Sequence, residues 1–83
     1  MIEFNVIVPH NEDGIIKTGE LLKKVFNFEI FDLREADMLR VKDNSKVYEV
    51  AIICCRGELE SYEMFKKLYK RQEIEYEGRP TLM

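Results

Sequence analysis

Few side chains in this chain could do chemistry, and the first group surrounds its only histidine. His10 lies in a polar loop with three further side chains, Asn11, Glu12 and Asp13. An imidazole beside carboxylates can act as a general acid or base. Catalysis would also need a nucleophile, metal ligands or a second base converging on the same point, and the sequence offers no such set. The alternative is a solvated loop histidine, so we expect no catalytic residues and no enzyme activity.

The same loop ends at Gly14, where a strand gives way to a helix. Backbone N–H groups at the start of a helix can bind an anion. A single glycine is a weak signal, neither a Walker nor a dinucleotide motif is present, and the acids at positions 12 and 13 would repel phosphate. Asn11 or Asp13 could instead cap the helix. The candidate ligand-binding residues are Asn11, Glu12, Asp13 and Gly14, with helix capping as the alternative.

A second group is the basic run formed by Lys66, Lys67, Lys70 and Arg71. These side chains could contact nucleic-acid phosphates. The alternative is a solvated helix face on which Glu63 pairs with Lys67. The formal net charge is -3, whereas nucleic-acid binders are more often basic, and no set of stacking aromatics lies among the bases. Nucleic-acid binding is therefore the weakest functional hypothesis.

The two cysteines, Cys54 and Cys55, are adjacent in a predicted strand. Neighbouring strand residues point to opposite faces, so a disulfide between them has poor geometry. We expect two reduced thiols in a cytoplasmic protein. Two cysteines and one histidine without ligand spacing also argue against structural zinc. No metal and no cofactor is expected.

Length and composition set the class of protein. We expect one globular domain over residues 1–83, because the chain is 46% hydrophobic and 35% charged. No apolar run reaches the roughly 20 residues needed to span a bilayer, and the N-terminus has no secretory signal pattern. A chain this short has a thin margin between burial and conformational entropy, which favours self-association.

The positions of apolar residues predict the elements that carry these side chains. They are a strand at 2–8, a helix at 14–26, a strand–turn–strand unit at 38–55, a helix at 58–72 and a strand at 73–80. Residues 28–34 could begin the second strand or form a separate crossing segment. This order predicts an α+β, ferredoxin-like βαββαβ fold, with a four-stranded antiparallel sheet and two helices on one face.

Such a sheet would have one face covered by helices and one open face. We expect the helices to cover Ile2, Phe4, Val6, Tyr48, Val50 and Ile52. The open face would then carry Ile7, Val47, Ala51, Ile53 and Cys55. An uncovered apolar patch usually marks an interface. The last strand alternates acidic and apolar residues, which is typical of a charged sheet edge.

Three short segments, Phe4–Pro9, Asp13–Ile15 and Phe28–Ile30, together resemble an ACT domain. ACT regulatory modules share the predicted strand order, a loop ending in glycine at the start of the first helix, and an Asn-Ile-like pair opening the second strand. The resemblance implies paired domains and a small effector, such as an amino acid, near residues 11–14.

The main expectation is a small non-enzymatic protein–protein interaction or regulatory module, such as an inhibitor or adaptor encoded by a phage or mobile element. It would act through the apolar sheet face and the acidic edge. Its partner would be another protein or a second copy, most simply a homodimer, and no membrane is expected. The alternatives are an ACT-like small-molecule sensor and, more weakly, nucleic-acid binding through the basic end of the second helix.

Overall fold

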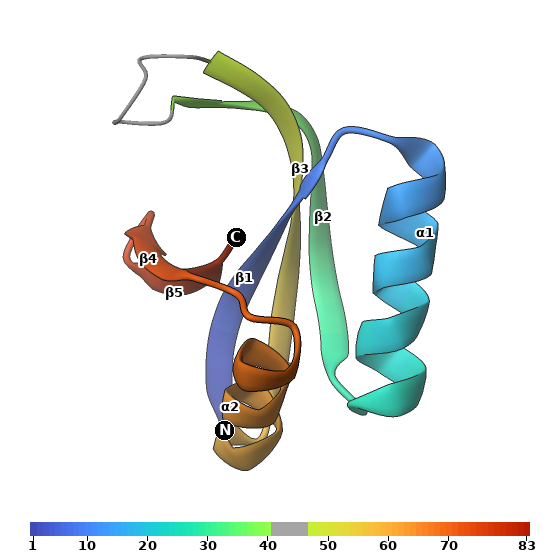
Figure 1. The fold of residues 1–83 in the computed structure, drawn as a ribbon, viewed down its shortest axis with the longest axis vertical. Coiled ribbons are helices and arrows are strands. Elements are labelled where there is room, and N and C mark those ends of the chain that lie inside the picture. The colour runs from blue at the N-terminus through green and yellow to red at the C-terminus, as the bar shows by residue number, and fades with distance from the viewer. Residues whose placement is uncertain (41–46) are drawn as a thin grey trace.

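The computed structural model describes the backbone of residues 1–40 and 47–83, and the side chains of residues 1–35 and 49–83. The first half of the chain forms β1 (Ile2–Pro9), α1 (Glu12–Glu20), the π-helical turn η1 (Leu21–Val25) and β2 (Glu29–Arg40). The second half forms β3 (Val47–Gly57), α2 (Leu59–Leu68), β4 (Glu73–Tyr76) and β5 (Arg79–Leu82) (Figure 1).

The five strands form one mixed sheet in the order β2-β3-β1-β5-β4. β3 is antiparallel to both β1 and β2, and β4 is antiparallel to β5, whereas β5 is parallel to β1. The α+β class is therefore confirmed. The predicted sheet of four antiparallel strands is not what forms, because a fifth strand is inserted beside β1.

That extra strand arises because the segment predicted as one strand, 73–80, is a hairpin. Its two turn residues, Glu77 and Gly78, have φ values of 53° and 76°. Two successive positive φ angles match the type I′ turn that suits a two-residue hairpin. The chain reverses there and places β5 between β4 and β1. A buried hydrogen bond of 3.1 Å, donated by Asn5 Nδ2 to Thr81 Oγ1, holds β5 against β1.

β2 is a single long strand, which resolves the ambiguity over residues 28–34. Its pairing with β3 is interrupted between Ile30 and Asp32 and again between Arg34 and Asp37. At the end of the ladder Leu39 lies opposite Tyr48. A strand–turn–strand unit whose turn is centred on Asn44-Ser45, as the sequence predicts, would instead place Leu39 opposite Val50. That predicted register is two residues away from the observed one, and the turn residues themselves lie outside the described residues.

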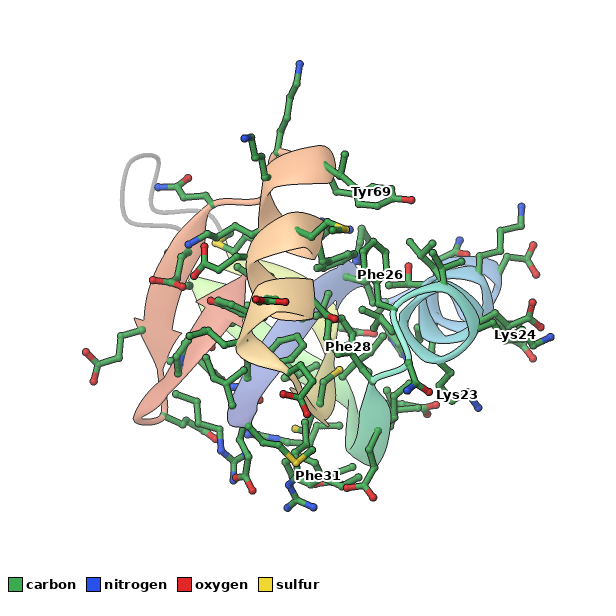
Figure 2. The ribbon with its side chains drawn as sticks, turned by 90° about the horizontal axis from the view of Figure 1, so that it is seen from below. Lys23, Lys24, Phe26, Phe28, Phe31 and Tyr69 are labelled. Atoms are coloured by element: carbon green, nitrogen blue, oxygen red, sulfur yellow. The ribbon has the colours of Figure 1, made fainter. Side chains whose placement is uncertain are left out.

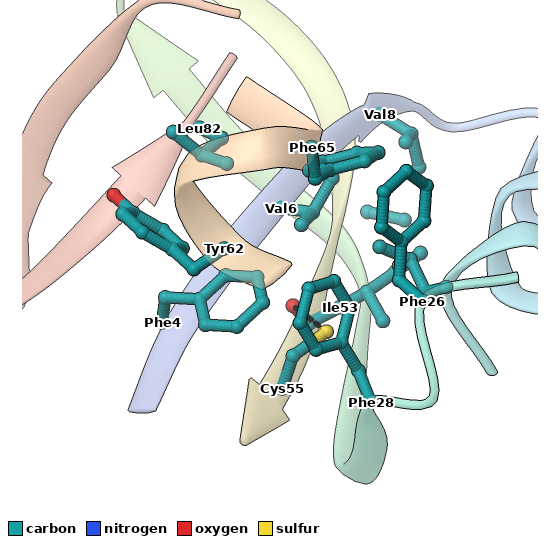
Figure 3. Packing of buried hydrophobic residues seen from close by; sticks show 12 residues of the cluster. Phe4, Val6, Val8, Phe26, Phe28, Ile53, Cys55, Tyr62, Phe65 and Leu82 are labelled. Atoms are coloured by element: carbon teal, nitrogen blue, oxygen red, sulfur yellow. Dashed lines mark hydrogen bonds between the residues drawn. The ribbon is translucent and has the colours of Figure 1, made fainter. Parts of the chain in front are cut away.

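One face of the sheet carries the main core (Figure 3). Side chains from η1 and α2 pack into the same cluster as those of β1 and β3, so the helical segments share one face, as predicted. The Phe4 ring lies 4.9 Å from the Phe28 ring and 4.8 Å from the Tyr62 ring, both in edge-on geometry. Phe65 and Phe26 continue this aromatic cluster at 5.2 Å.

The other face is covered by the chain's own hairpin. A second buried cluster, formed by Ile7, Val50, Ile52 and Cys54, has Ile74 and Tyr76 of β4 packed against it. Arg34 on edge strand β2 donates two hydrogen bonds to the carboxylate of Glu77 in the β4–β5 turn. Since β2 and β4 are opposite edges of the sheet, this ion pair links the two edges across the face that was predicted to be open.

The link between Arg34 and Glu77 should make folding stability depend on pH. The hydrogen bond from Arg34 holds the pKa of Glu77 below its ordinary value of 4.5. A carboxylate with a lowered folded-state pKa contributes stability above its unfolded pKa, and this contribution is lost as the pH falls through the folded-state value. We expect Glu77→Gln to lower the melting temperature at pH 7 and to flatten its decline below about pH 4.5.

Thermal unfolding followed by circular dichroism from pH 7 to pH 3 would measure how the melting temperatures of the wild type and of the variant decline with pH. Glu75→Gln is a matched control, because Glu75 is an exposed acid of the same hairpin and no ion pair of it occurs in the described part of the chain. A Glu77→Gln curve that parallels the wild-type curve would show that the ion pair does not contribute.

Candidate functional site

The residues from His10 to Gly14 connect the end of β1 to the first turn of α1. Asn11 Oδ1 accepts a 3.0 Å hydrogen bond from the Gly14 N–H, which is the capping geometry considered above. Glu12 and Asp13 lie in the exposed first turn of α1, where their negative charges interact favourably with the positive end of the helix dipole. A Cβ at Gly14 would lie 3.7 Å from Asn11 Oδ1, an ordinary contact. Ligand binding at this loop stays a prediction.

His10 has one acidic neighbour, which the sequence did not identify. Its Nδ1 forms a hydrogen bond with the Glu49 carboxylate on β3. The pair lies at the end of the β1–β3 ladder, where Pro9 is opposite Val50. Among the described side chains, those of residues 1–35 and 49–83, no group of three histidine, cysteine or acidic residues is arranged to bind a metal.

The predicted interface residues lie on both faces of the sheet. Ile7 lies in the second cluster and is only 6% exposed. Ala51, Ile53 and Cys55 lie instead in the core beneath the helices. Only the backbone of Val47 is described, and it lies opposite Arg40. The predicted assignment of β3 residues to the two faces is therefore wrong, and these buried side chains form no open apolar patch.

The register of β1 on β3 explains this error. Phe4 lies opposite Cys55, and Val6 lies opposite Ile53. Residues directly opposite each other share a face of the sheet. The odd-numbered residues of β3 must therefore join the even-numbered residues of β1 beneath the helices.

Both cysteines are free and buried. Burial raises the pKa of the Cys55 thiol to about 12 and also raises that of Cys54. Both thiols therefore stay protonated at neutral pH. Because the thiolate is the reactive form, the two side chains are unreactive and behave as core residues.

The basic residues at the end of α2 are brought together, as predicted. Lys66, Lys67, Lys70 and Arg71 line an open pocket of about 920 Å³ together with Glu63, Met64, Leu68 and Glu73. Lys66 is the paired member, with its Nζ 3.2 Å from Glu63 and 3.6 Å from Glu73. Glu63 thus pairs with Lys66 instead of the predicted Lys67.

A groove between α1 and β2 was missed by the sequence analysis. It encloses about 380 Å³ and is lined by Ile15, Ile16, Gly19, Glu20, Lys23, Ile30, Leu33 and Ile53. Ile16 is 52% exposed and Leu33 is 40% exposed, and α1 itself contains no fully buried residue. The adjacent pair Ile15-Ile16 was the sequence signal for this groove. Neighbouring residues of a helix point in different directions, so when Ile15 faces the core Ile16 is left toward the surface.

Comparisons with protein-family models, with curated proteins and with solved structures found no match to this chain. Among the helices that the structure describes, none is both long enough and apolar enough to cross a membrane.

Proposed function

We propose that this protein is a non-enzymatic interaction module that docks on a second copy of itself through the groove between α1 and β2. The observation that carries the proposal is the apolar lining of this groove, with Ile16 and Leu33 partly exposed on its two walls. Apolar side chains gathered in a surface hollow are typical of an interaction site. The proposal keeps the expected mode of action and moves it from the sheet face to this edge of the molecule.

Gly19 gives independent support for an occupant of the groove. A glycine inside a helix costs about 1 kcal/mol relative to alanine. A Cβ at Gly19 would lie 3.8 Å from Ile30 Cδ1, which is an ordinary contact. Packing within one copy therefore does not require glycine here, whereas a partner entering the groove beside α1 would gain room from it.

The charges at the rim favour a second copy over an unrelated partner. Glu20 and Lys23 lie one helical turn apart on the same wall. Across a two-fold axis each residue of one copy can meet the other residue of its partner, so this rim is complementary to itself. The two pairing interruptions in β2 make its edge irregular, which disfavours strand addition and leaves side-chain packing as the mode of contact.

Sedimentation equilibrium of the purified protein tests this proposal. We expect a concentration-dependent dimer, and we expect Ile16→Asp or Leu33→Asp to weaken it at least 10-fold, because each places a charge in the apolar contact. Gly19→Ala should raise the melting temperature of the monomer through a gain of up to about 1 kcal/mol and should weaken the dimer as well. Opposite effects on folding and association would separate the two roles.

Val25→Asp is the matched control, because Val25 is an exposed apolar residue of η1, even more exposed than Ile16 or Leu33, and it does not line the groove. A wild-type chain that remains monomeric at millimolar concentration would contradict the proposal. A dimer weakened as strongly by Val25→Asp as by Leu33→Asp would place the contact elsewhere and would also contradict it.

The remaining expectations stay predictions. They are the lack of enzyme activity, the inhibitor or adaptor role, the ACT-like resemblance and the cytoplasmic location. The strand order β2-β3-β1 with both helical segments on one face supports a ferredoxin-like arrangement whose fourth strand is replaced by the β4–β5 hairpin.

A further inference from the structure

Arg71 is a half-buried cation with few partners. Its guanidinium donates one hydrogen bond of 3.3 Å to the Ile7 carbonyl and lies 5.8 Å from the centre of the Phe65 ring. A guanidinium carries five N–H donors, so most of them make no hydrogen bond to the residues that the structure describes. No carboxylate in the described part of the chain forms an ion pair with it. Burial lowers the pKa of Arg71, as expected for a cation that has lost water without gaining an anion.

The contact with Ile7 fixes the position of this guanidinium. β5 pairs with β1 only at Asn5 and Val6, so the ladder ends just before Ile7. Arg71 takes over as the donor to the Ile7 carbonyl beyond that point. The fold thus holds Arg71 in place by one edge of its guanidinium and leaves the other donors available.

Lys70 occupies a backbone position that normally favours glycine. Its φ is 51°, in the left-handed region where side chains are strained. Lys70 follows Tyr69, the C-cap of α2. The chain turns away from the helix here, with the Lys70 N–H donating to the Lys67 carbonyl and the Arg71 N–H donating to the Lys66 carbonyl. Glycine is the usual residue at such a helix end. A lysine kept there adds a cation to the pocket at a cost to the fold.

The acidic side chains of the pocket do not neutralise these cations. Glu63 and Glu73 both pair with Lys66, and Glu73 also accepts a hydrogen bond from the Tyr62 hydroxyl. Lys67, Lys70 and Arg71 form no ion pair with any described carboxylate. The pocket is therefore locally positive although the whole chain carries a net charge of -3.

We propose that the pocket at the C-terminal end of α2 binds the phosphate groups of an anionic ligand through Lys67, Lys70 and Arg71. Phosphate fits this set because its oxygens accept paired hydrogen bonds from a guanidinium and single ones from ammonium groups. The exposed side chains of Met64 and Leu68 border the same pocket and offer apolar contact to whatever carries the phosphate. This inference does not depend on self-association, because the groove and the pocket share no lining residue.

Two probes test the inference, each with a different source of phosphate. A labelled oligothymidylate is followed by fluorescence anisotropy, and pyrophosphate by calorimetry. If the oligonucleotide binds, the slope of log affinity against log salt should be near −2, because each phosphate contacted on a single strand contributes about −0.7. If pyrophosphate alone binds, the ligand is a free phosphate compound. Either result supports the site.

Two variants separate ligand binding from folding. Lys67→Gln should weaken binding about 10-fold or less and reduce the salt slope by about 0.7. Lys70→Gly should weaken binding similarly while raising the melting temperature, because glycine relieves the left-handed strain. Lys17→Gln removes an exposed charge of α1 and serves as the control. The proposal is overturned if neither probe binds, or if Lys17→Gln weakens binding as much as the pocket variants do.

Discussion

Phe4→Ala should lose about 3–5 kcal/mol of folding free energy, the largest effect that we expect from a single substitution in this chain. Phe4 is completely buried at the centre of the main core. Its ring makes edge-on contacts with Phe28 at 4.9 Å and with Tyr62 at 4.8 Å. Removing it leaves a cavity and breaks both aromatic contacts. Small domains have a total stability near the lower end of about 5–15 kcal/mol, so the variant should be largely unfolded at 37 °C.

Urea denaturation followed by circular dichroism would measure this loss. Phe31→Ala is the matched control, because Phe31 is also a strand phenylalanine but lies on the face away from the helices (Figure 2). It is 37% exposed and contacts the guanidinium groups of Arg56 at 4.9 Å and Arg79 at 5.2 Å. We expect its removal to cost about 1 kcal/mol or less. Equal losses in the two variants would contradict the assignment of the core to the helix-covered face.

Gly57→Ala should destabilise the fold by about 1–3 kcal/mol through overpacking. A Cβ at Gly57 would lie 2.2 Å from Phe28 Cδ1 and 2.8 Å from Phe28 Cε1. The Phe28 ring cannot easily move away, because it contacts Phe4 and stacks on Phe26 at 5.7 Å. For a domain of this size we expect the melting temperature to fall by roughly 4–8 °C for each kcal/mol lost.

A double-mutant cycle identifies the cause of this loss. In a Phe28→Leu background the ring that meets the new Cβ is absent, so Gly57→Ala should cost less there than in the wild type. Gly14→Ala is the control for glycine substitution in general, since its Cβ would make only an ordinary contact at 3.7 Å. Additive losses from Gly57→Ala and Phe28→Leu would rule out the clash as the cause.

The two proposed binding surfaces can be tested separately, because they lie on different elements. The groove is formed by α1 and β2, and the phosphate pocket lies at the end of α2. If two copies associate through the groove, the phosphate pocket of each copy remains accessible, because it lies on other elements of the fold. Variants that abolish self-association should therefore leave the salt slope of phosphate binding unchanged.

Local sequence determined the elements whose signal repeats within a short segment. The alternation of Ile2, Phe4, Val6 and Val8 predicts β1, which spans Ile2–Pro9, because side chains of a strand alternate between its faces. Asn11 and Gly14 indicate the start of α1, and the cap forms there, because an N-cap side chain reaches only the next turn. Lys66 and Lys67 lie in the last turn of α2, and Lys70 and Arg71 follow shortly after it in the chain, so closeness in the sequence is enough to bring these basic residues together.

Only the tertiary structure determined which face each β3 residue occupies. Residues 50–55 are apolar throughout, so no alternation distinguishes one face from the other. The choice depends on the register with β1, where Val6 lies opposite Ile53. A shift of one residue reverses every side chain, and register is set by contacts between segments far apart in the chain.

The closure of the second sheet face was also decided by tertiary contacts. Gly78 was a visible turn signal, but Glu77 before it gave no sign of the positive φ that it adopts. The resulting hairpin brings Glu77 to Arg34, 43 residues away in the chain, and buries the face that the strand pattern alone left open. Periodicity is a local property of a segment, whereas burial depends on which distant segment covers it. For this reason the sequence predicted most of the elements, and the fold decided which of their surfaces remained free to bind.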